Sequence, residues 1–538
     1  MSLHDDSAFS EAPTPKELAA YDLNDYGHAM RLIRLSGGRI DDNGVDIRHS
    51  RLLYVIGIGW IGFHETHWDS KFGDVLARRT AHAVGQKMRD PAVRAELVDK
   101  HALDPISMRK FLDQLGQAGS TSAMLKQAES YLTVEIDAFD TDPMLINCRN
   151  FTLKVGLDKD GKLKVVKRPH SPADRITRMV DVDYDPQASA ELYVKVFQES
   201  LPDPEISGFF KRCMGYAITG QVYEQAFFIL QGKGRDGKST LLDAAREVMG
   251  GYGGVGDINT FLETTNAGAS GASPDLIKLA GDVRLVVLSE PQRGAKFHEG
   301  RLKAWTSGSP ITARQLREAP IDFRPKGKLF VECNALPVVR GDDEGIWRRA
   351  NVIPFENQVD PDKVDKQLPQ KLRGEFPGIF NWLLEGVGDW LRRGLDRPDA
   401  IRKVLDDYRR ESSPFGDWLT TRCVFSKGAE GRRELSKDLY GDYKAWCEEQ
   451  GHDTKQVMSI KAFGTALTQR QIRPAGLNSQ GLQYRGPIRL KSKDELAQDI
   501  ARTNGGPPGV ISGGASATPR GTDDFENDPL SMEGDPFA

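Results

Sequence analysis

Short apolar runs alternate with helical patterns in the middle of the chain. Residues 226–230, 283–288 and 329–333 are short, mainly apolar runs, and residues 240–248 have the spacing of a helix. Apolar runs of this length are typical of strands buried on both faces, and strands separated by helices favour a parallel sheet. The pattern therefore predicts, over residues 204–356, an α/β fold with a mainly parallel sheet between helices.

The segment before this region has a mixed pattern. Residues 74–86 and 106–115 have helical spacing, whereas 52–56 and 163–166 are short runs typical of strands. An Asp-Lys-Asp-Gly sequence at 158–161 separates two apolar residues, which predicts a β-hairpin at that point.

Helical spacing returns at 376–395, and a helix–helix–strand order at 412–490 suits a winged helix. From residue 492 the chain is rich in Gly, Pro, Ser and Asp, which predicts disorder. We therefore predict six parts: a disordered N-terminus (1–20), a mixed α/β N-terminal domain (21–203), the α/β region (204–356), a helical segment (357–411), a winged-helix-like domain (412–491) and a disordered acidic tail (492–538).

Composition narrows the class of protein. The chain has 538 residues, 39% hydrophobic and 28% charged, as expected of a globular protein with several domains. Its formal net charge of −4 means that a contact with nucleic acid must use a local basic surface. The five cysteines form no CxxC pair, which favours a reduced, cytoplasmic compartment without a zinc module. The longest apolar run, 52–63, is too short to span a bilayer, and the N-terminus has no signal-peptide core, so we expect no membrane partner.

The strongest chemical signal is a phosphate-binding motif, G-x-x-x-x-G-K-S, at 232–239. It lies between an apolar strand and a helix, so that backbone amides would surround the phosphates and the helix dipole would point at them. Lys238 would hold the β and γ phosphates of ATP, and the Ser239 hydroxyl would bind Mg²⁺. The predicted nucleotide-binding residues are Gly232, Lys233, Gly234, Arg235, Asp236, Gly237, Lys238, Ser239 and Thr240.

Polar residues follow two other predicted strands. Glu290 comes at the carboxyl edge of the sheet, where it could bind Mg²⁺ or polarise the attacking water, and Asn334 could orient that water or sense the γ-phosphate. A surface glutamate and a turn asparagine are the plain alternatives, but the upstream phosphate motif favours the catalytic interpretation.

Two arginines, Arg348 and Arg349, follow an acidic, glycine-containing loop at 341–345. An arginine there could reach a nucleotide bound by a neighbouring subunit, a contribution of roughly 10³–10⁵ in rate where such fingers exist. The alternative is an ion pair with Asp342 or Asp343, and spacing alone does not decide between the two roles or the two arginines.

In this order the motifs resemble those of the superfamily 3 helicases, specifically the phage, plasmid and poxvirus primase-helicase branch. Residues 284–290 resemble its Walker B segment, 303–314 its B′ motif, and 330–334 its motif C with Asn334 as the sensor. Arg348 or Arg349 matches its arginine finger. The resemblance extends over roughly residues 20–490, including an N-terminal helicase-associated domain and a C-terminal winged helix.

The resemblance implies an AAA+-like core that uses ATP and Mg²⁺, in a homo-oligomeric ring expected to be a hexamer. The ring would translocate on single-stranded or forked DNA during phage or plasmid replication, in the cytoplasm of a bacterial host cell. The family's polymerase-like primase domain normally precedes the helicase region, and only about twenty residues do so here. Priming would then come from a separate primase or not be needed, and a single-strand-binding protein is a further candidate partner.

Two departures from the family pattern concern the site. Asp236 stands where the family usually has Asn, in a loop that works mainly through its backbone. The sequence Ser307-Gly308-Ser309 stands where the B′ motif usually has Gly-Gly-Asp, which puts the geometry of this motif in doubt.

In this family the B′ motif leads into a hairpin in the central channel of the ring. The corresponding segment here, 311–328, carries several cations among few acids. We predict Lys303, Arg314, Arg317 and Lys326 as DNA contacts, with binding that is independent of sequence and sensitive to salt. A solvated charged loop is the alternative.

Three further features stay outside this assignment. The basic winged-helix candidate could bind duplex DNA or dock a partner protein, and the sequence leaves both open. His64 and His67 form HExH rather than HExxH, so we expect no metal there. The acidic tail that ends in Pro-Phe-Ala could recruit a partner, as the tails of single-strand-binding proteins do, or serve only solubility.

The sequence thus predicts an ATP-dependent DNA helicase. One rival is a DNA-dependent ATPase that acts as a clamp or loader without unwinding, which the altered Ser309 favours. Another is a sensor of foreign DNA that uses the same motor.

Overall fold

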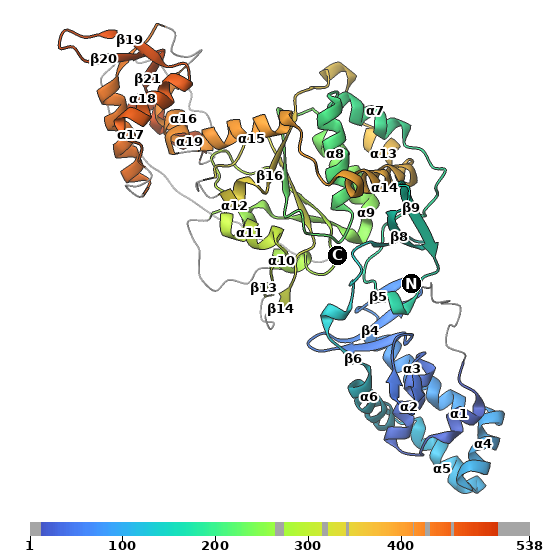
Figure 1. The fold of residues 1–538 in the computed structure, drawn as a ribbon. Coiled ribbons are helices and arrows are strands. Elements are labelled where there is room, and N and C mark those ends of the chain that lie inside the picture. The colour runs from blue at the N-terminus through green and yellow to red at the C-terminus, as the bar shows by residue number, and fades with distance from the viewer. Residues whose placement is uncertain are drawn as a thin grey trace, which may run out of the picture. The chain divides into compact units, whose positions relative to one another are not determined.

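The computed structural model describes most of the chain (Figure 1). The described residues are 12–263, 274–314, 321–339, 344–412, 414–425, 431–452 and 457–503. They divide into a unit that ends at Leu490 and a unit that begins at Lys491.

The first part of the larger unit combines helices with short strands. Its elements are α1 (Pro15–Ala20), α2 (Asp25–Leu35), β1 (Arg39–Asp41), β2 (Gly44–Asp46), β3 (Leu52–Val55), β4 (Gly59–His64), β5 (His67–Asp69), α3 (Gly73–Met88), α4 (Pro91–His101), α5 (Pro105–Leu115), α6 (Ala118–Leu132), β6 (Thr133–Val134), β7 (Leu145–Asn147), β8 (Thr152–Leu157) and β9 (Leu163–Arg168). The helices predicted at 74–86 and 106–115 are confirmed as α3 and α5, and the strand predicted at 52–56 as β3.

Local sequence sets where these helices begin. Thr14 and Glu17 form a reciprocal capping box at the start of α1, with distances of 3.1 and 3.2 Å. Asp90 and Asp104 cap α4 and α5, each followed by a proline at the first helical position. The prediction that residues 1–20 are disordered is therefore wrong for α1, because the capping box and Pro15 start a helix there.

β7, β8 and β9 form a separate antiparallel sheet. Leu157 pairs with Leu163 across the turn, where Gly161 has a φ of 74°, so the predicted hairpin is confirmed. Leu153 and Val155 belong to the hydrophobic cluster of the region that follows, not to the clusters of the preceding helices. The domain predicted over 21–203 therefore contains residues of three different hydrophobic clusters.

The central region is built around a parallel sheet. Its elements are α7 (Glu191–Ser200), α8 (Pro204–Ala217), β10 (Phe227–Gly232), α9 (Lys238–Met249), β11 (Gly253–Gly256), α10 (Pro274–Lys278), β12 (Leu285–Leu288), α11 (Glu299–Thr306), β13 (Ile311–Ala313), β14 (Ile321–Phe323), β15 (Lys328–Cys333), α12 (Glu344–Trp347), β16 (Ala350–Phe355), α13 (Leu368–Arg373), α14 (Phe376–Arg393) and α15 (Asp399–Ser412).

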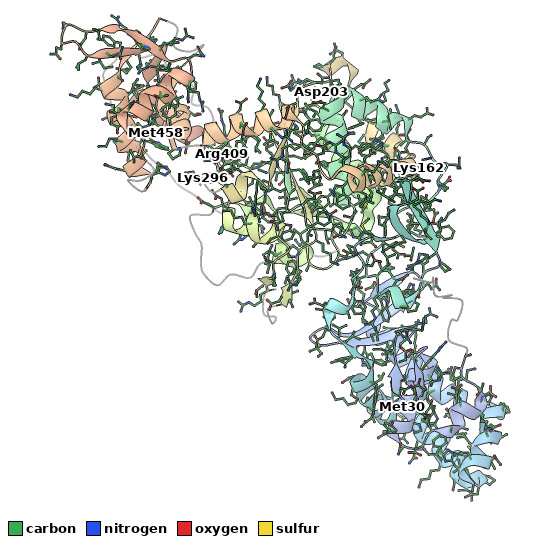
Figure 2. All side chains as sticks on the ribbon, in the orientation of Figure 1. Met30, Lys162, Asp203, Lys296, Arg409 and Met458 are labelled. Atoms are coloured by element: carbon green, nitrogen blue, oxygen red, sulfur yellow. The ribbon has the colours of Figure 1, made fainter. Side chains whose placement is uncertain are left out.

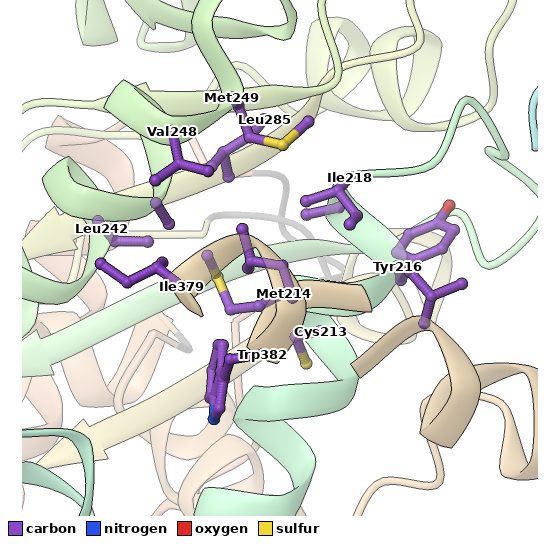
Figure 3. Close-up of a cluster of buried hydrophobic side chains, with 14 of the residues drawn as sticks. Cys213, Met214, Tyr216, Ile218, Leu242, Val248, Met249, Leu285, Ile379 and Trp382 are labelled. Carbon is purple, nitrogen blue, oxygen red and sulfur yellow. The ribbon is translucent and has the colours of Figure 1, made fainter. Parts of the chain in front are cut away.

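The order of this sheet is β11-β12-β15-β10-β16, and every neighbouring pair is parallel. Successive residues of β10 enter different hydrophobic clusters: Phe228 and Leu230 face α8, α9 and α14, whereas Phe227 and Ile229 face α10, α11 and α15. Figure 3 shows part of the first cluster. The prediction of a parallel sheet covered on both faces is confirmed.

Buried charges connect the amino edge of this sheet to the segments before it. Arg284 forms an ion pair of 2.6 Å with Asp282, and both side chains are buried. Lys326 donates to the carbonyl of Asp140 at 2.6 Å and lies 3.4 Å from Asp282 Oδ1. Although burial acts to raise it, the cations Arg284 and Lys326 hold the pKa of Asp282 below its usual value.

The last part of the larger unit has its own core. Its elements are α16 (Pro414–Arg422), β17 (Cys423–Phe425), β18 (Glu434–Leu435), α17 (Ser436–Glu449), α18 (Ile460–Gln469), β19 (Arg473–Leu477), β20 (Gln483–Gly486) and β21 (Ile488–Leu490). Trp418, Tyr443 and Phe463 pack together at its centre. Met458, labelled in Figure 2, accepts a hydrogen bond from the Tyr440 hydroxyl at 2.9 Å.

The second unit is described only near its start. Residues 493–503 form the helix α19 (Lys493–Thr503), so the prediction of disorder from 492 is wrong there. Ser492 and Glu495 exchange capping hydrogen bonds of 2.8 and 3.3 Å, which explains where this helix begins. Across the described ranges, no helix has both the length and the hydropathy needed to cross a bilayer.

Candidate functional site

The loop between β10 and α9 has backbone conformations that favour glycine. Gly234 and Gly237 have φ values of 84° and 86°, and Arg235 between them lies in the same region at 54°. A Cβ at Gly237 would lie 2.0 Å from Ser200 Oγ, and one at Gly232 would lie 2.1 Å from Asp236 Oδ2. These close approaches explain why glycine is needed at both ends of the loop.

An ion pair lies inside this loop. Lys238 Nζ is 2.6 Å from Asp236 Oδ2, and both side chains are buried. The same carboxylate oxygen accepts a hydrogen bond from the Gly234 amide at 3.0 Å. A carboxylate of the protein therefore engages donors of the kind that bind phosphate in such loops.

The segment after β16 forms hydrogen bonds to the backbone of the phosphate-binding loop. Gln358 Nε2 donates to the carbonyls of Lys233 and Gly234 at 3.3 and 3.0 Å. The Val359 amide donates to the carbonyl of Arg235 at 2.7 Å. The edge strand and the phosphate-binding motif are thus connected by hydrogen bonds.

A cavity of about 320 Å³ opens beside the loop. It is lined by Gly234, Arg235, Asp236, Gly237, Lys238, Ser239, Thr240, Glu290, Glu332, Cys333 and Asn334. The structure therefore brings together most of the predicted nucleotide-binding residues with the predicted acid and the predicted sensor.

Glu290 and Asn334 contact each other at the carboxyl edge of the sheet. The Asn334 amide donates to Glu290 Oε1 at 3.1 Å, and Asn334 Nδ2 donates to Glu290 Oε2 at 2.9 Å. Both residues follow neighbouring strands, β12 and β15, and both are exposed. Asn334 can therefore orient the carboxylate of Glu290 beside the cavity.

Glu332 is a residue of the cavity that the sequence analysis missed. It lies in β15, two positions before Asn334, which follows that strand, and both residues line the cavity. Burial raises the pKa of the Glu332 carboxyl, and a hydrogen bond with Ser239 opposes that effect. The signal in the sequence was a charged residue inside an otherwise apolar strand.

The oxygen atoms at this edge suit a hard cation. The Ser239 hydroxyl and the carboxylates of Glu290 and Glu332 line one cavity, and Mg²⁺ prefers such ligands. Among the described residues, Glu332 Oε1 is a buried oxygen without a hydrogen-bond partner. The donor set therefore fits a magnesium ion.

The two candidate finger arginines lie in different surroundings. Arg349 is 8% exposed and donates to the Gly345 carbonyl at 2.7 Å and to Gln225 Oε1 at 2.6 Å. Arg348 is exposed. The acids proposed as its alternative partners, Asp342 and Asp343, lie outside the described residues.

The predicted DNA contacts are separated in the structure. β13 and β14 pair as an antiparallel hairpin, and the exposed Arg314 follows β13, whereas Arg317 lies outside the described residues. Lys303 lies on α11, 3.7 Å from Glu299. Lys326 takes part in the buried charge cluster at the amino edge of the sheet, so its ammonium group is held there rather than at the hairpin.

His64 and His67 do not form part of a metal-binding group in the described chain. Across the described residues, no cluster of three or more His, Cys, Asp or Glu side chains could hold a metal ion. The His64 ring stacks on Phe72 with 5.6 Å between centroids. Burial lowers the pKa of His67.

Family models match two parts of the chain. Residues 43–204 match a model described as D5 N terminal like, and residues 230–349 match a family of unknown function, DUF5906. The second match contains the phosphate-binding loop, Glu290 and Asn334.

Curated relatives come from viruses. "Putative helicase L207/L206" of Acanthamoeba polyphaga mimivirus is 26% identical over 372 residues, which cover 64% of this chain and 37% of that protein. "Putative helicase 022R" of Frog virus 3 (isolate Goorha) is 30% identical over 164 residues, which cover 30% of this chain and 17% of that protein. The chain thus spans less than half the length of these relatives.

Among solved structures, the apo A form of the NrS-1 C terminal region is similar to this chain. The match covers 81% of this chain and 94% of that chain, at 12% identity and a TM-score of 0.37. A similarity at this level carries no argument about the site. The family matches and the relatives named as putative helicases show that the chain is similar to viral D5-like primase-helicases.

Proposed function

We propose that this protein is an ATP-dependent DNA helicase of phage or plasmid replication that translocates on single-stranded or forked DNA. The observation that carries the proposal is the single cavity in which the phosphate-binding loop, Glu290 and Asn334 meet. Its occurrence in a chain whose relatives are named as helicases supports the choice of reaction.

The residues of the cavity would have separate roles in ATP hydrolysis. Lys238 and the loop amides would bind the phosphates, and Ser239 would ligate Mg²⁺ together with Glu290. Bound Mg²⁺ would neutralise charge on the phosphates. Asn334 would hold the Glu290 carboxylate in the orientation that it needs to polarise the attacking water, through the two hydrogen bonds described above.

The order of the sheet supports an AAA+-like core. The strand that carries Asn334 lies between the strand of the phosphate-binding loop and the strand of Glu290. All three strands are parallel, so their carboxyl ends meet at one edge. In the same way, the helix–strand–strand–helix–helix–hairpin–strand order of 414–490 supports a winged helix.

We propose Arg348, rather than Arg349, as the arginine finger. Arg348 precedes β16 at the amino edge of the sheet, where Ala350 pairs with the first residue of β10. β16 has six residues, so the finger and the phosphate-binding loop of one chain are separated by about 20 Å. Arg348 would therefore serve the site of a neighbouring subunit, as expected in a homo-oligomeric ring such as a hexamer.

DNA would contact the β13–β14 hairpin. Arg314 is exposed there, and we retain it with Arg317 as the proposed phosphate contacts. Lys303 is kept as a proposed contact at the side of α11 that also carries Glu299, and Lys326 is left out because it is engaged with Asp140 and Asp282. A separate primase or single-strand-binding protein would be the remaining partner.

The proposal is tested by measuring ATP hydrolysis stimulated by single-stranded DNA and strand displacement from forked duplexes of both polarities. Lys238→Ala and Arg348→Ala are each expected to abolish both activities. Arg392→Ala, an exposed arginine paired within its own helix, is the control and should keep them.

Mixing the two inactive variants tests whether the finger acts between subunits. A Lys238→Ala subunit still carries a finger, and an Arg348→Ala subunit still has an intact loop, so the mixture should recover hydrolysis. Hydrolysis by the wild type without strand displacement at either polarity would instead identify a clamp or loader, the alternative that Ser309 favours.

A further inference from the structure

The part of the chain from 457 to 490 has an unusual distribution of charge. It contains no aspartate or glutamate, although the whole protein has more acidic than basic residues, 77 against 73. Its cations are Lys461, Arg470, Arg473, Arg485 and Arg489. The preceding helix, α17, carries both acids and cations. The absence of acids therefore begins after α17, in the segment that contains α18.

The acid-free segment includes α18. Phe463 and Leu467 of α18 are fully buried in the core of this part of the molecule. The opposite side of the helix exposes Lys461, Thr465 and Gln469. Those side chains can donate hydrogen bonds, and none carries a negative charge.

The hairpin of β19 and β20 is connected to α18 by a hydrogen bond. Arg485 of β20 donates to Thr468 Oγ1 of α18 at 2.9 Å, and the Arg433 guanidinium lies 4.5 Å from the centre of the Tyr484 ring. Arg473 of β19 is exposed. Lys461 of the helix and Arg473 of the hairpin are thus exposed on two elements of the acid-free segment, and the hydrogen bond between Arg485 and Thr468 connects these two elements.

We infer that α18 and the β19–β20 hairpin bind double-stranded DNA. A helix with exposed Lys, Thr and Gln fits the major groove, and cations on an adjacent hairpin can contact the phosphates beside it. The segment itself contributes no carboxylate that would repel the phosphates of the duplex. This inference goes beyond the proposed function, which needs only single-stranded DNA at the β13–β14 hairpin.

A protein partner is less consistent with this surface. The centres of protein interfaces are depleted of lysine and enriched in aromatic residues. Within 457–490, which the structure describes throughout, the exposed large apolar side chains are Ile460 and Leu477. Tyr484 lies under the Arg433 guanidinium and is only partly exposed.

The test measures binding of the full-length protein to a labelled blunt duplex by fluorescence anisotropy at several salt concentrations. Lys461→Glu combined with Arg473→Glu is expected to weaken duplex binding by roughly tenfold or more and to lower the slope of log K against log salt by about two. Both side chains are exposed, so the fold should persist, which the thermal unfolding midpoint checks.

Lys444→Glu is the matched control, because Lys444 is exposed on α17 of the same part of the molecule but outside the acid-free segment. It should leave duplex affinity unchanged. ATP hydrolysis stimulated by single-stranded DNA should be unchanged in every variant, which separates this inference from the proposed function. Full duplex affinity in the double variant, or an equal loss in Lys444→Glu, would overturn the inference and leave a protein partner as the occupant.

Discussion

At the scale of single residues, Asp236 sets the electrostatics of the phosphate-binding loop. Its carboxylate neutralises Lys238 at 2.6 Å, and Glu290 and Glu332 line the same cavity. A nucleotide phosphate would therefore have to displace a negative charge that belongs to the protein. Asparagine at this position could keep the hydrogen bond from the Gly234 amide without that charge.

We predict that Asp236→Asn binds ADP roughly tenfold more tightly than the wild type when Mg²⁺ is absent, because a like charge a few ångströms from the phosphates is removed. Titration with a fluorescent ADP analogue measures the effect. Asp243→Asn, an exposed acid on α9 that does not line the cavity, is the control. Equal affinity of Asp236→Asn and the wild type would contradict this account.

His28 makes the stability of the N-terminal part dependent on pH. Burial, and then the nearby Arg31, lower the pKa of His28 to about 4 from its ordinary 6.5. Between about pH 6.5 and pH 4, His28 is protonated in the unfolded chain but neutral in the folded chain. The free energy of unfolding therefore falls as pH falls through this range. The expected loss is about 3 kcal/mol, from a shift of that size.

His28→Asn keeps a hydrogen-bond acceptor near Arg31 without a titrating ring. Its unfolding free energy, measured in denaturant at several pH values, should fall less between pH 6.5 and 4 than that of the wild type. His82→Asn changes an exposed histidine and should leave the wild-type pH dependence in place. The same pH dependence in His28→Asn and the wild type would refute the assignment.

The sequence identified those residues of the site that belong to the phosphate-binding motif or that follow a predicted strand. Gly232 to Thr240 were predicted from the motif, Glu290 and Asn334 were predicted from strand ends, and the structure brings all of these but Gly232 and Lys233 to one cavity. Glu332 was missed because its role depends on which neighbour lies beside its strand. The burial of Arg349 depends on a contact with Gln225, 124 positions away, which no local pattern contains.

At the scale of elements, the contact between α8 and α14 depends on two glycines. A Cβ at Gly215 would lie 2.0 Å from the carbonyl carbon of Gly386, which is closer than atoms can approach. The two helices meet backbone to backbone at this point, beside the cluster in Figure 3 that contains Met214 and Tyr216.

We predict that Gly215→Ala lowers the free energy of unfolding by roughly 1–3 kcal/mol, because the helices must move apart. Gly441→Ala is the control in α17, where an added Cβ meets nothing within 4 Å. It should raise stability by about 0.5–1 kcal/mol, since alanine favours the helix. Thermal or denaturant unfolding measures both, and a neutral Gly215→Ala would show that the helices adjust at no cost.

Elements were predicted well where periodicity alone defines them. β10, β12, β15 and α14 follow apolar patterns that need no knowledge of the partner segment. α1 and α19 were missed because short helices in polar sequence are started by capping boxes rather than by an apolar stripe.

At the scale of the whole molecule, hydrophobic cores do not follow the boundaries drawn from the sequence. The cluster around α14 runs from Leu145 to Ile401 and takes in the β7–β9 sheet. Patterns along the chain reveal elements but not which elements share a core, because that depends on packing between distant segments. The predicted boundary at residue 203 therefore falls within one continuous core.

In the proposed ring, β16 would also affect how neighbouring subunits communicate. Arg348 precedes this strand, and Gln358 and Val359, which hold the phosphate-binding loop, follow it. A strand that is hydrogen-bonded along its length to β10 keeps a fixed length, so a shift of the loop at one end is carried to the arginine at the other. Each subunit of a ring would then signal the occupancy of its own site to the next, and ATP turnover would be cooperative.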